Sequence, residues 1–353
     1  MGVQNVPSTR RTRITPSTVV EERLGESADG ADPGRMDLHP ALAETADRQR
    51  GIVHRHQLYA VGVTRAQLRW QLGRDWQAVL PGVVALFTGR LDHEQRLIAA
   101  WLYAGSDATI TGIEAARRHG IRYLPPPGTV HLFVNERRKS RRAGFAVVRA
   151  STRVDPSSRM LAGLRCASPA RAVVDAAPFL PGPRAVEAVV LQVVQRRLAT
   201  LPTLRHELER APNRSSLALR AGVIAAEAGV WSAPEADCLR LLRSSQVLPE
   251  ILPNATLKDS CGVLLPTPDF WIQDVGLGVQ IHSREHHTEG EDFDNTLDDD
   301  GTLTAAGATI LGITPAQLTK NPLRHLRRVE ATYLSLRTEG RQHSIQVVRI
   351  ASA

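Results

Sequence analysis

The sequence predicts an α+β protein of several domains, with a winged helix near the N-terminus and a mixed sheet with flanking helices near the C-terminus. Three observations lead to this prediction. The chain has 353 residues, which exceeds the length of one ordinary domain. Short helical segments followed by a Pro-Gly hairpin occupy residues 45–89. Helical and β-prone segments alternate over residues 230–338, which is typical of a sheet covered by helices.

The composition is that of a globular protein with an affinity for polyanions. Hydrophobic residues make up 42% of the chain, which suffices for buried cores, and the formal net charge is +8. A surplus of cations favours nucleic acid, although by itself it indicates only non-specific attraction. The three cysteines form no CxxC pair, which argues against a zinc module or a disulfide scaffold and predicts a reducing cytoplasm. The apolar runs are too short for a membrane span, so no membrane partner is expected.

The first 89 residues predict a polar tail and then a compact winged helix. Residues 1–44 are rich in Ser, Thr, Pro, Gly and charge without an apolar period, which predicts a disordered tail. Three short helices are expected next, the second ending near Gly62 and the third near Gly73. Apolar strands on both sides of Pro81-Gly82 then predict a hairpin.

The segment Arg65–Leu72 is the predicted recognition helix. Spacings of four residues place its apolar side chains on one inward stripe, made of Ala66, Leu68, Trp70 and Leu72. The candidate DNA-binding side chains are the capping Thr64 and the outer face, made of Arg65, Gln67, Arg69 and Gln71. Arg and Gln read guanine and adenine edges in the major groove of double-stranded DNA. The alternative is a small helical cap whose Arg and Gln side chains only meet solvent.

A second group of candidate DNA contacts lies in the basic segment Glu136–Arg149. Clustered cations can neutralise phosphates, and those of this segment are Arg137, Arg138, Lys139, Arg141, Arg142 and Arg149. We select Arg137, Arg138 and Arg141 as candidate DNA-binding residues. The alternative is a solvated hairpin loop between strands over Val130–Val134 and Phe145–Val148. By contrast, Arg171 and Asp175 are four residues apart on a predicted helix, and we interpret them as a structural pair.

The winged-helix segment HRHQLYAVGVTRAQLRWQLGRDWQAVLPGVVALF resembles the DNA-binding domain of AbiEi-type antitoxins. The similarity continues through Asp92–Ala177, where TGIEAA and RHGI occur early and GLRCASPARAVVDAA closes the region. Ala167 and Ala172 stand where hydroxyl residues are common in that family. The resemblance implies an AbiEi-like middle domain over 90–178, transcriptional autoregulation, and a cognate toxin protein as a partner.

The remaining segments predict a helical connector and then a sheet domain. Residues 179–229 predict a connector of three helices, which are Arg184–Arg197, Pro202–Glu209 and Leu217–Glu227. Residues 230–338 predict the order α-β-β-β-α-β-α. Its elements are a helix opened by Ser232 and running to Arg243, strands near Glu250–Leu257, Gly262–Ile272 and Leu277–His282, a helix over Glu291–Ala305, a strand over Ala308–Thr314 and a helix over Pro322–Leu336. Residues 339–353 are expected to be a tail.

Two strands of this domain predict the skeleton of a metal-dependent nuclease site. Asp269 lies inside the first strand, where a solvated acid would be poorly placed. Gln280 and His282 share a face of the next strand and could lie opposite it. In such sites carboxylates hold a hard divalent cation. A Gln carbonyl is neutral and attracts a dication much less than an acid does.

Three sequence features accompany this order of elements: Glu235 in the first helix, PDFW at Pro268–Trp271 and VQIHSREHH at Val279–His287. Together they resemble the restriction-endonuclease-like fold and its very-short-patch-repair-like DUF559 group. In active members a helix Glu, the PDF Asp and a third-strand acid bind magnesium. The resemblance assigns these positions to Glu235, Asp269 and Gln280, with His282 where an Asp is frequent. The following helix carries acids that would repel phosphate, which are Glu291, Asp292, Asp294, Asp298, Asp299 and Asp300.

The sequence leaves two interpretations of this domain open. In the first, cleavage has been lost, no cofactor is needed, and the protein is a DNA-binding regulator or antitoxin. In the second, Glu235, Asp269 and either His286 or His287 hold one Mg²⁺ ion, and the protein is a Mg²⁺-dependent endonuclease. Glu235 and Asp269 could also be buried structural acids. We interpret the grouping of His282, His286 and His287 as chance clustering, not as a zinc site.

Overall fold

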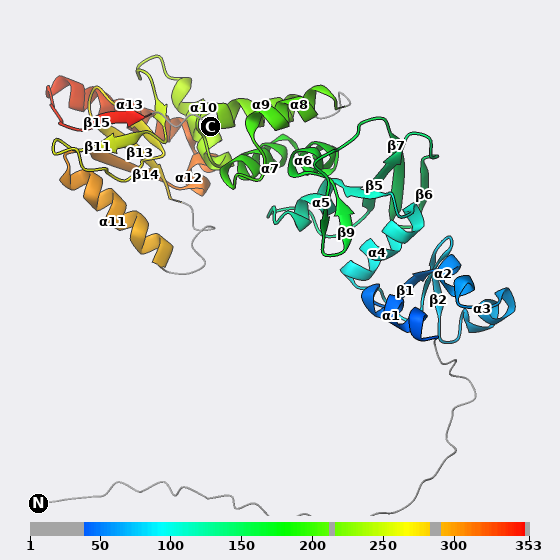
Figure 1. Cartoon of the computed structure of the whole chain (residues 1–353). Helices are drawn as coiled ribbons and strands as arrows, with labels where there is room; N and C mark the ends of the chain where they lie inside the picture. Colours follow the sequence, from blue (N-terminus) through cyan, green and yellow to red (C-terminus); the bar gives the residue numbers. More distant parts are fainter. Residues whose placement is uncertain (1–38, 212–215, 283–290, 350–353) are drawn as a thin grey trace, which may run out of the picture.

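The computed structural model describes residues 39–211, 216–282 and 291–349, which form an α+β fold with several mixed sheets (Figure 1). The predicted fold class is confirmed. Figure 1 shows the winged-helix region in blue at one end, the C-terminal sheet in yellow to red at the other, and helices between them. None of the helices in these ranges combines the length and apolarity that a membrane span requires. The predicted tail lies outside the described residues up to residue 38.

The winged-helix region contains three helices and a three-stranded antiparallel sheet in the order β1-β3-β2. Its elements are α1 (Pro40–Arg48), β1 (Ile52–His54), α2 (Arg55–Ala60), α3 (Arg65–Gln71), β2 (Gln77–Leu80) and β3 (Val83–Ala85). The predicted hairpin is confirmed, but β1 was not predicted. The tail predicted to end at residue 44 is too long, because Pro40 at the first turn and the side-chain cap of His39 begin α1 there.

Both faces of this small sheet are buried. Val53 and Val84 lie opposite each other and pack with α1, α2 and α3. Alternation places Ile52 and Ala85 on the other face, where they join the core that contains α4 (His93–Ala104). The winged helix and the region that follows therefore share a core across the boundary predicted after residue 89.

The middle region is a six-stranded mixed sheet in the order β6-β7-β5-β4-β9-β8. Its strands are β4 (Thr109–Thr111), β5 (Val130–Asn135), β6 (Arg141–Ala143), β7 (Ala146–Ser151), β8 (Arg159–Leu161) and β9 (Leu164–Cys166), and α4, α5 (Gly112–Arg118) and α6 (Pro169–Ala176) pack with them. The expected hairpin between the strands now called β5 and β7 is wrong, because these strands are parallel. Gly144, with φ +46°, instead turns the chain between the antiparallel β6 and β7.

The connector contains helices close to those predicted, which are α7 (Pro183–Gln195), α8 (Leu201–Glu209) and α9 (Ser216–Glu227), preceded by the 3-10 turn η1 (Ala177–Phe179). α7 and α9 pack tightly where Gly222 meets Val190. A Cβ at Gly222 would lie 2.8 Å from the Val190 Cβ, so the glycine permits this close approach. The buried residues of the connector belong to the same core as those of the middle sheet and of the next helix.

The C-terminal region has the predicted order with three additional elements, which are two strands and one short helix. Its main elements are α10 (Ala233–Arg243), β10 (Leu252–Pro253), β12 (Phe270–Ile272), β13 (Leu277–Ile281), α11 (Glu291–Ala305), β14 (Thr309–Ile313), α12 (Pro315–Lys320) and α13 (Pro322–Thr338). The sheet order is β10-β12-β13-β14, and only β13 and β14 are parallel among these neighbours. The predicted strand Glu250–Leu257 is divided at Asn254, whose φ of +46° turns the chain. Its second part, β11 (Thr256–Lys258), pairs with β15 (Gln346–Arg349), so the predicted tail over 339–353 contains a strand.

Candidate nucleic-acid interface and nuclease-like cluster

The start of α3 is held by reciprocal hydrogen bonds between Thr64 and Gln67. The Thr64 Oγ1 accepts from the Gln67 backbone N–H at 3.2 Å, and the Gln67 Oε1 accepts from the Thr64 backbone N–H at 2.8 Å. This capping box satisfies two backbone donors that a helix start otherwise leaves unpaired. Two of the predicted DNA-binding side chains therefore help to begin the helix.

The buried face of α3 differs from the prediction at two adjacent residues. Gln71 is buried at 2% exposure, whereas Trp70 is 46% exposed. The prediction that Gln71 faces DNA and Trp70 faces the core is therefore wrong. The reason lies after the helix, where Trp76 fills the small core at 5% exposure and donates its backbone N–H to the Gln71 carbonyl at 3.1 Å. The inward stripe is consequently Leu68, Gln71 and Leu72, and Ala66 is exposed.

The exposed face of α3 carries cations and one aromatic ring. Arg65 and Arg69 are four residues apart and exposed, as predicted. No carboxylate among the described residues forms an ion pair with either of them. Arg74 stacks on the Trp70 ring with 4.4 Å between the guanidinium carbon and the ring centroid. This pair was not predicted, although its spacing of four residues is visible in the sequence.

Two of the three selected arginines in the basic segment serve the fold. Arg141 donates to the carbonyls of Tyr103 and Ala104, at 2.9 and 2.7 Å, where α4 ends. Arg138 donates to Asp107 Oδ1 at 2.7 Å and also reaches the Ala104 carbonyl. The last carbonyls of a helix lack partners within it, so these arginines cap α4. Arg137 remains exposed.

The other arginines of this segment line a hollow of about 550 Å³, whose wall also contains Glu114. Arg142 and Arg149 are exposed there, and no described carboxylate forms an ion pair with them. His131 lines the same hollow and stacks on Phe179 at 4.2 Å between centroids. Burial, followed by the charges of the two arginines, lowers the pKa of His131 to about 4, so its ring is neutral at neutral pH. Gly144 lies against Leu80, which places the hairpin that carries Arg142 beside the wing.

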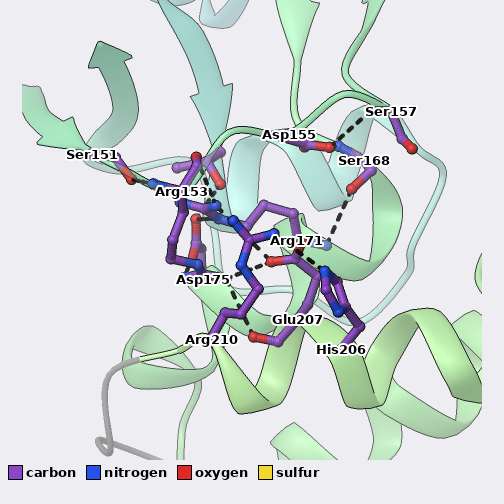
Figure 2. A network of polar contacts seen from close by, with 11 residues as sticks. Ser151, Arg153, Asp155, Ser157, Ser168, Arg171, Asp175, His206, Glu207 and Arg210 are labelled. Carbon is purple, nitrogen blue, oxygen red and sulfur yellow. Dashed lines mark hydrogen bonds and ion pairs between the residues drawn. The ribbon is translucent and has the colours of Figure 1, made fainter. Parts of the chain in front are cut away.

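The predicted pair of Arg171 and Asp175 belongs to a closed network (Figure 2). The Arg171 Nε lies 2.6 Å from Asp175 Oδ2, and Arg153 bridges Asp175 at 3.3 Å and Glu207 at 2.5 Å. Thr111 donates to the same Asp175 at 2.8 Å. The side chains come from β4, α6, α8 and the loop after β7, and they point toward one another. Two cations thus face two carboxylates, and their ion pairs connect the connector helices to the middle sheet. This structural role agrees with the interpretation of Arg171 and Asp175 as a structural pair.

Asp269 and Gln280 face each other across the hairpin of β12 and β13, as predicted. Phe270 pairs with Val279, so the preceding Asp269 lies opposite Gln280. The Asp269 backbone N–H donates to Gln280 Oε1 at 3.2 Å. The Ile281 backbone N–H donates to Asp269 Oδ2. The amide oxygen that would have to replace a carboxylate ligand is therefore already engaged.

Glu235 acts as an acceptor at the start of α10. Its Oε1 accepts from Ser232 Oγ at 2.7 Å, and its Oε2 accepts from the Trp231 N–H at 3.0 Å and from Asn254 Nδ2 at 3.2 Å. Glu235 is buried. Burial, and then the charge of Glu235, raise the pKa of Asp269 well above its ordinary value. The fold therefore brings the two predicted acids together, and it also gives each a structural partner.

His282 turns toward the acidic helix. Its Nε2 lies 3.4 Å from Asp300 Oδ2, and its ring covers Gly312, where a Cβ would come within 2.4 Å of the same Nε2. Asp298 and Asp299 are exposed on α11, whereas the side chains of the other acids predicted there lie outside the described residues. His286 and His287 also lie outside them. Over the described ranges no three His, Cys, Asp or Glu side chains are arranged to hold a metal ion.

Comparisons with known proteins give one structural likeness. No protein-family model matches the chain, and no curated protein matches it. Among solved structures, the chain is similar to the crystal structure of the RV2827C protein from Mycobacterium tuberculosis, with 15% identity and a TM-score of 0.40. The likeness covers 59% of this chain and 82% of that one.

Proposed function

We propose that the protein is a transcription regulator of the antitoxin kind that binds double-stranded DNA through α3. The exposed face of α3 is the observation that carries this proposal. Arg65 and Arg69 project from one side of a helix that is capped at its start and packed against a small core. A helix in this place of a winged helix enters the major groove, where arginine donates two hydrogen bonds to guanine.

Neighbouring cations support contacts to the DNA backbone. The stacked Trp70 and Arg74 extend the exposed face of α3 toward the start of the wing. Arg142 and Arg149 lie on the hairpin that packs beside the wing. Such residues contribute affinity without sequence preference, because phosphates are the same at every base step.

The arrangement of the acids supports a C-terminal domain that does not cleave DNA. A magnesium ion at Asp269 would need a second strong oxygen anion nearby. Gln280 offers a neutral oxygen that already accepts a hydrogen bond, and Glu235 accepts three. We therefore propose no metal cofactor. In an antitoxin role the further partner is a toxin chain, and copurification of a second protein in stoichiometric amount would support it.

Fluorescence anisotropy with a duplex from upstream of the protein's own coding sequence tests the proposal. The double variant Arg65→Ala/Arg69→Ala should bind at least about 30-fold more weakly, because each arginine–guanine contact is worth about 1–3 kcal/mol. Arg48→Ala is the matched control, since Arg48 is an exposed arginine of the same region that pairs with Glu44 on α1. Unchanged affinity of the double variant would rule out α3 as the reading element.

A further inference from the structure

A cationic hollow lies where α12 meets α13, and none of its lining residues belongs to the α3 face or to the cluster of Glu235 and Asp269. Its volume is about 280 Å³, and its lining residues are Gln317, Lys320, Asn321, Arg324, His325 and Arg328. Three of them are cations, none is an acid, and the others can donate hydrogen bonds. Over the described residues, no carboxylate forms an ion pair with Lys320, Arg324 or Arg328. The hollow therefore concentrates positive charge that the fold leaves uncompensated.

The local sequence explains how these side chains converge. Thr314 caps α12 through a capping box with Gln317, and Asn321 both ends α12 and begins α13. Pro322 then occupies the first turn of α13, a helix of 17 residues. Arg324 and Arg328 are four residues apart on one face of α13, and Lys320 joins them in the hollow from the end of α12. The Asn321 side chain makes no cap hydrogen bond, so the positive end of the α13 dipole adds to the same field.

His325 adds a nearly buried ring to the wall of this hollow. The residue is 8% exposed, and its Nδ1 has no hydrogen-bond partner among the described residues. Unpaired polar atoms are rare in protein interiors, because burial without a partner costs about 1–3 kcal/mol. Burial, and then the charges of Arg324 and Arg328, lower the pKa of His325. An anion in the hollow would oppose the charges of Arg324 and Arg328 and so raise the pKa of His325 again.

We propose that this hollow binds a phosphate group. Arginine and lysine donors in one concave site match the several acceptor oxygens of phosphate. The volume is slightly below the usual range for pockets that hold whole drug-sized ligands, which starts at about 300 Å³. The hollow therefore has room for a phosphate group.

The phosphate can belong to a DNA strand or to a free molecule. α12 begins directly after β14, whose Gly312 pairs with Gln280, so a strand laid over this end of the sheet would pass near the hollow. The assignment to DNA rests on the proposed function, whereas the binding of phosphate itself does not.

Titration of the full chain with inorganic phosphate, followed through the His325 ring by NMR, tests the site. The His325 signal should move saturably, and its pKa should rise when phosphate is bound. Arg324→Ala/Arg328→Ala should lose this response. Arg327→Ala is the matched control, because Arg327 is exposed on the same helix and does not line the hollow. An unmoved His325 signal, or an equal loss with Arg327→Ala, would overturn the proposal.

The salt dependence of DNA binding shows whether the bound phosphate belongs to a DNA strand or to a free molecule. If the hollow holds a backbone phosphate, Arg324→Ala/Arg328→Ala should lower the slope of log K against log salt concentration by about 1 to 2. An unchanged slope with an intact phosphate response would assign the site to a free phosphate-bearing molecule and refute the DNA assignment. A wild-type His325 signal that does not respond to phosphate, with DNA binding still dependent on Arg65 and Arg69, would refute the hollow and leave the proposed function standing.

Discussion

Arg65 and Arg69 on α3 are exposed and have no ion-pair partner among the described residues, whereas Glu235 and Asp269 in the C-terminal region are enclosed by groups that donate to them. Both sets were selected from sequence because their residue types suit a ligand. Their surroundings separate them, because a buried carboxylate needs hydrogen bonds to offset its lost hydration, and an exposed guanidinium does not. Exposure and the lack of an internal partner, more than residue type, therefore decide which charged side chains can bind a ligand.

The largest expected effect is on stability, from Glu235→Ala. This variant should lower the free energy of unfolding by about 3 kcal/mol, since the part-buried donors of Ser232 and Trp231 and the buried amide of Asn254 lose their acceptor. The double variant Arg65→Ala/Arg69→Ala should change it by no more than about 0.5 kcal/mol per residue. Urea denaturation of both variants gives the comparison. Equal losses would remove the distinction between the two regions.

The next effect concerns pH and Asp269→Asn. The folded state raises the pKa of Asp269, so it binds the proton more tightly than the unfolded chain does. The stability from this group is full below its ordinary pKa of about 4 and is lost as the pH rises through the folded pKa. Asp269→Asn should therefore match the wild type near pH 4 and be more stable than the wild type at neutral pH, because the neutral amide avoids the cost of a buried charge. Denaturation at several pH values measures this difference, and a less stable variant at neutral pH would contradict it.

Trp70→Ala should separate binding from folding within α3. Because the ring is 46% exposed, its removal should cost less than about 1 kcal/mol of unfolding free energy. DNA affinity should fall about 5- to 10-fold, because the platform for Arg74 is lost. Leu68→Ala is the control from the buried side of the same helix and should cost about 2–4 kcal/mol. A large loss of stability in Trp70→Ala would place this ring in the core after all.

The smallest expected effect is that of magnesium. Saturating magnesium chloride should shift the melting temperature of the wild type by less than about 1 °C, because only binding to the folded state stabilises it. Plasmid DNA should remain uncut. Magnesium-dependent nicking that disappears in Asp269→Ala would instead establish an active endonuclease and make Glu235 and Asp269 available charges like those of α3.

Local signals predicted much of the fold. Thr64 and Ser232 cap the helices that they were expected to cap, and the helix over Glu291–Ala305 has the expected bounds. These signals depend on hydrogen bonds and side-chain spacing within a few residues. The opposition of Asp269 and Gln280 was also predictable, because a short hairpin determines which residues face each other.

The sequence by itself therefore determined the order of most helices and strands in the C-terminal region, the caps of several helices and the residues that meet across one hairpin. Only the tertiary structure decided that β5 and β7 are parallel, that Trp76 displaces Trp70 from the small core, and that Arg138 and Arg141 cap α4. The physical reason is the range of the interactions. Sheet partners and buried sites are chosen by competition among residues that are distant in the chain, and no local spacing records which of them wins.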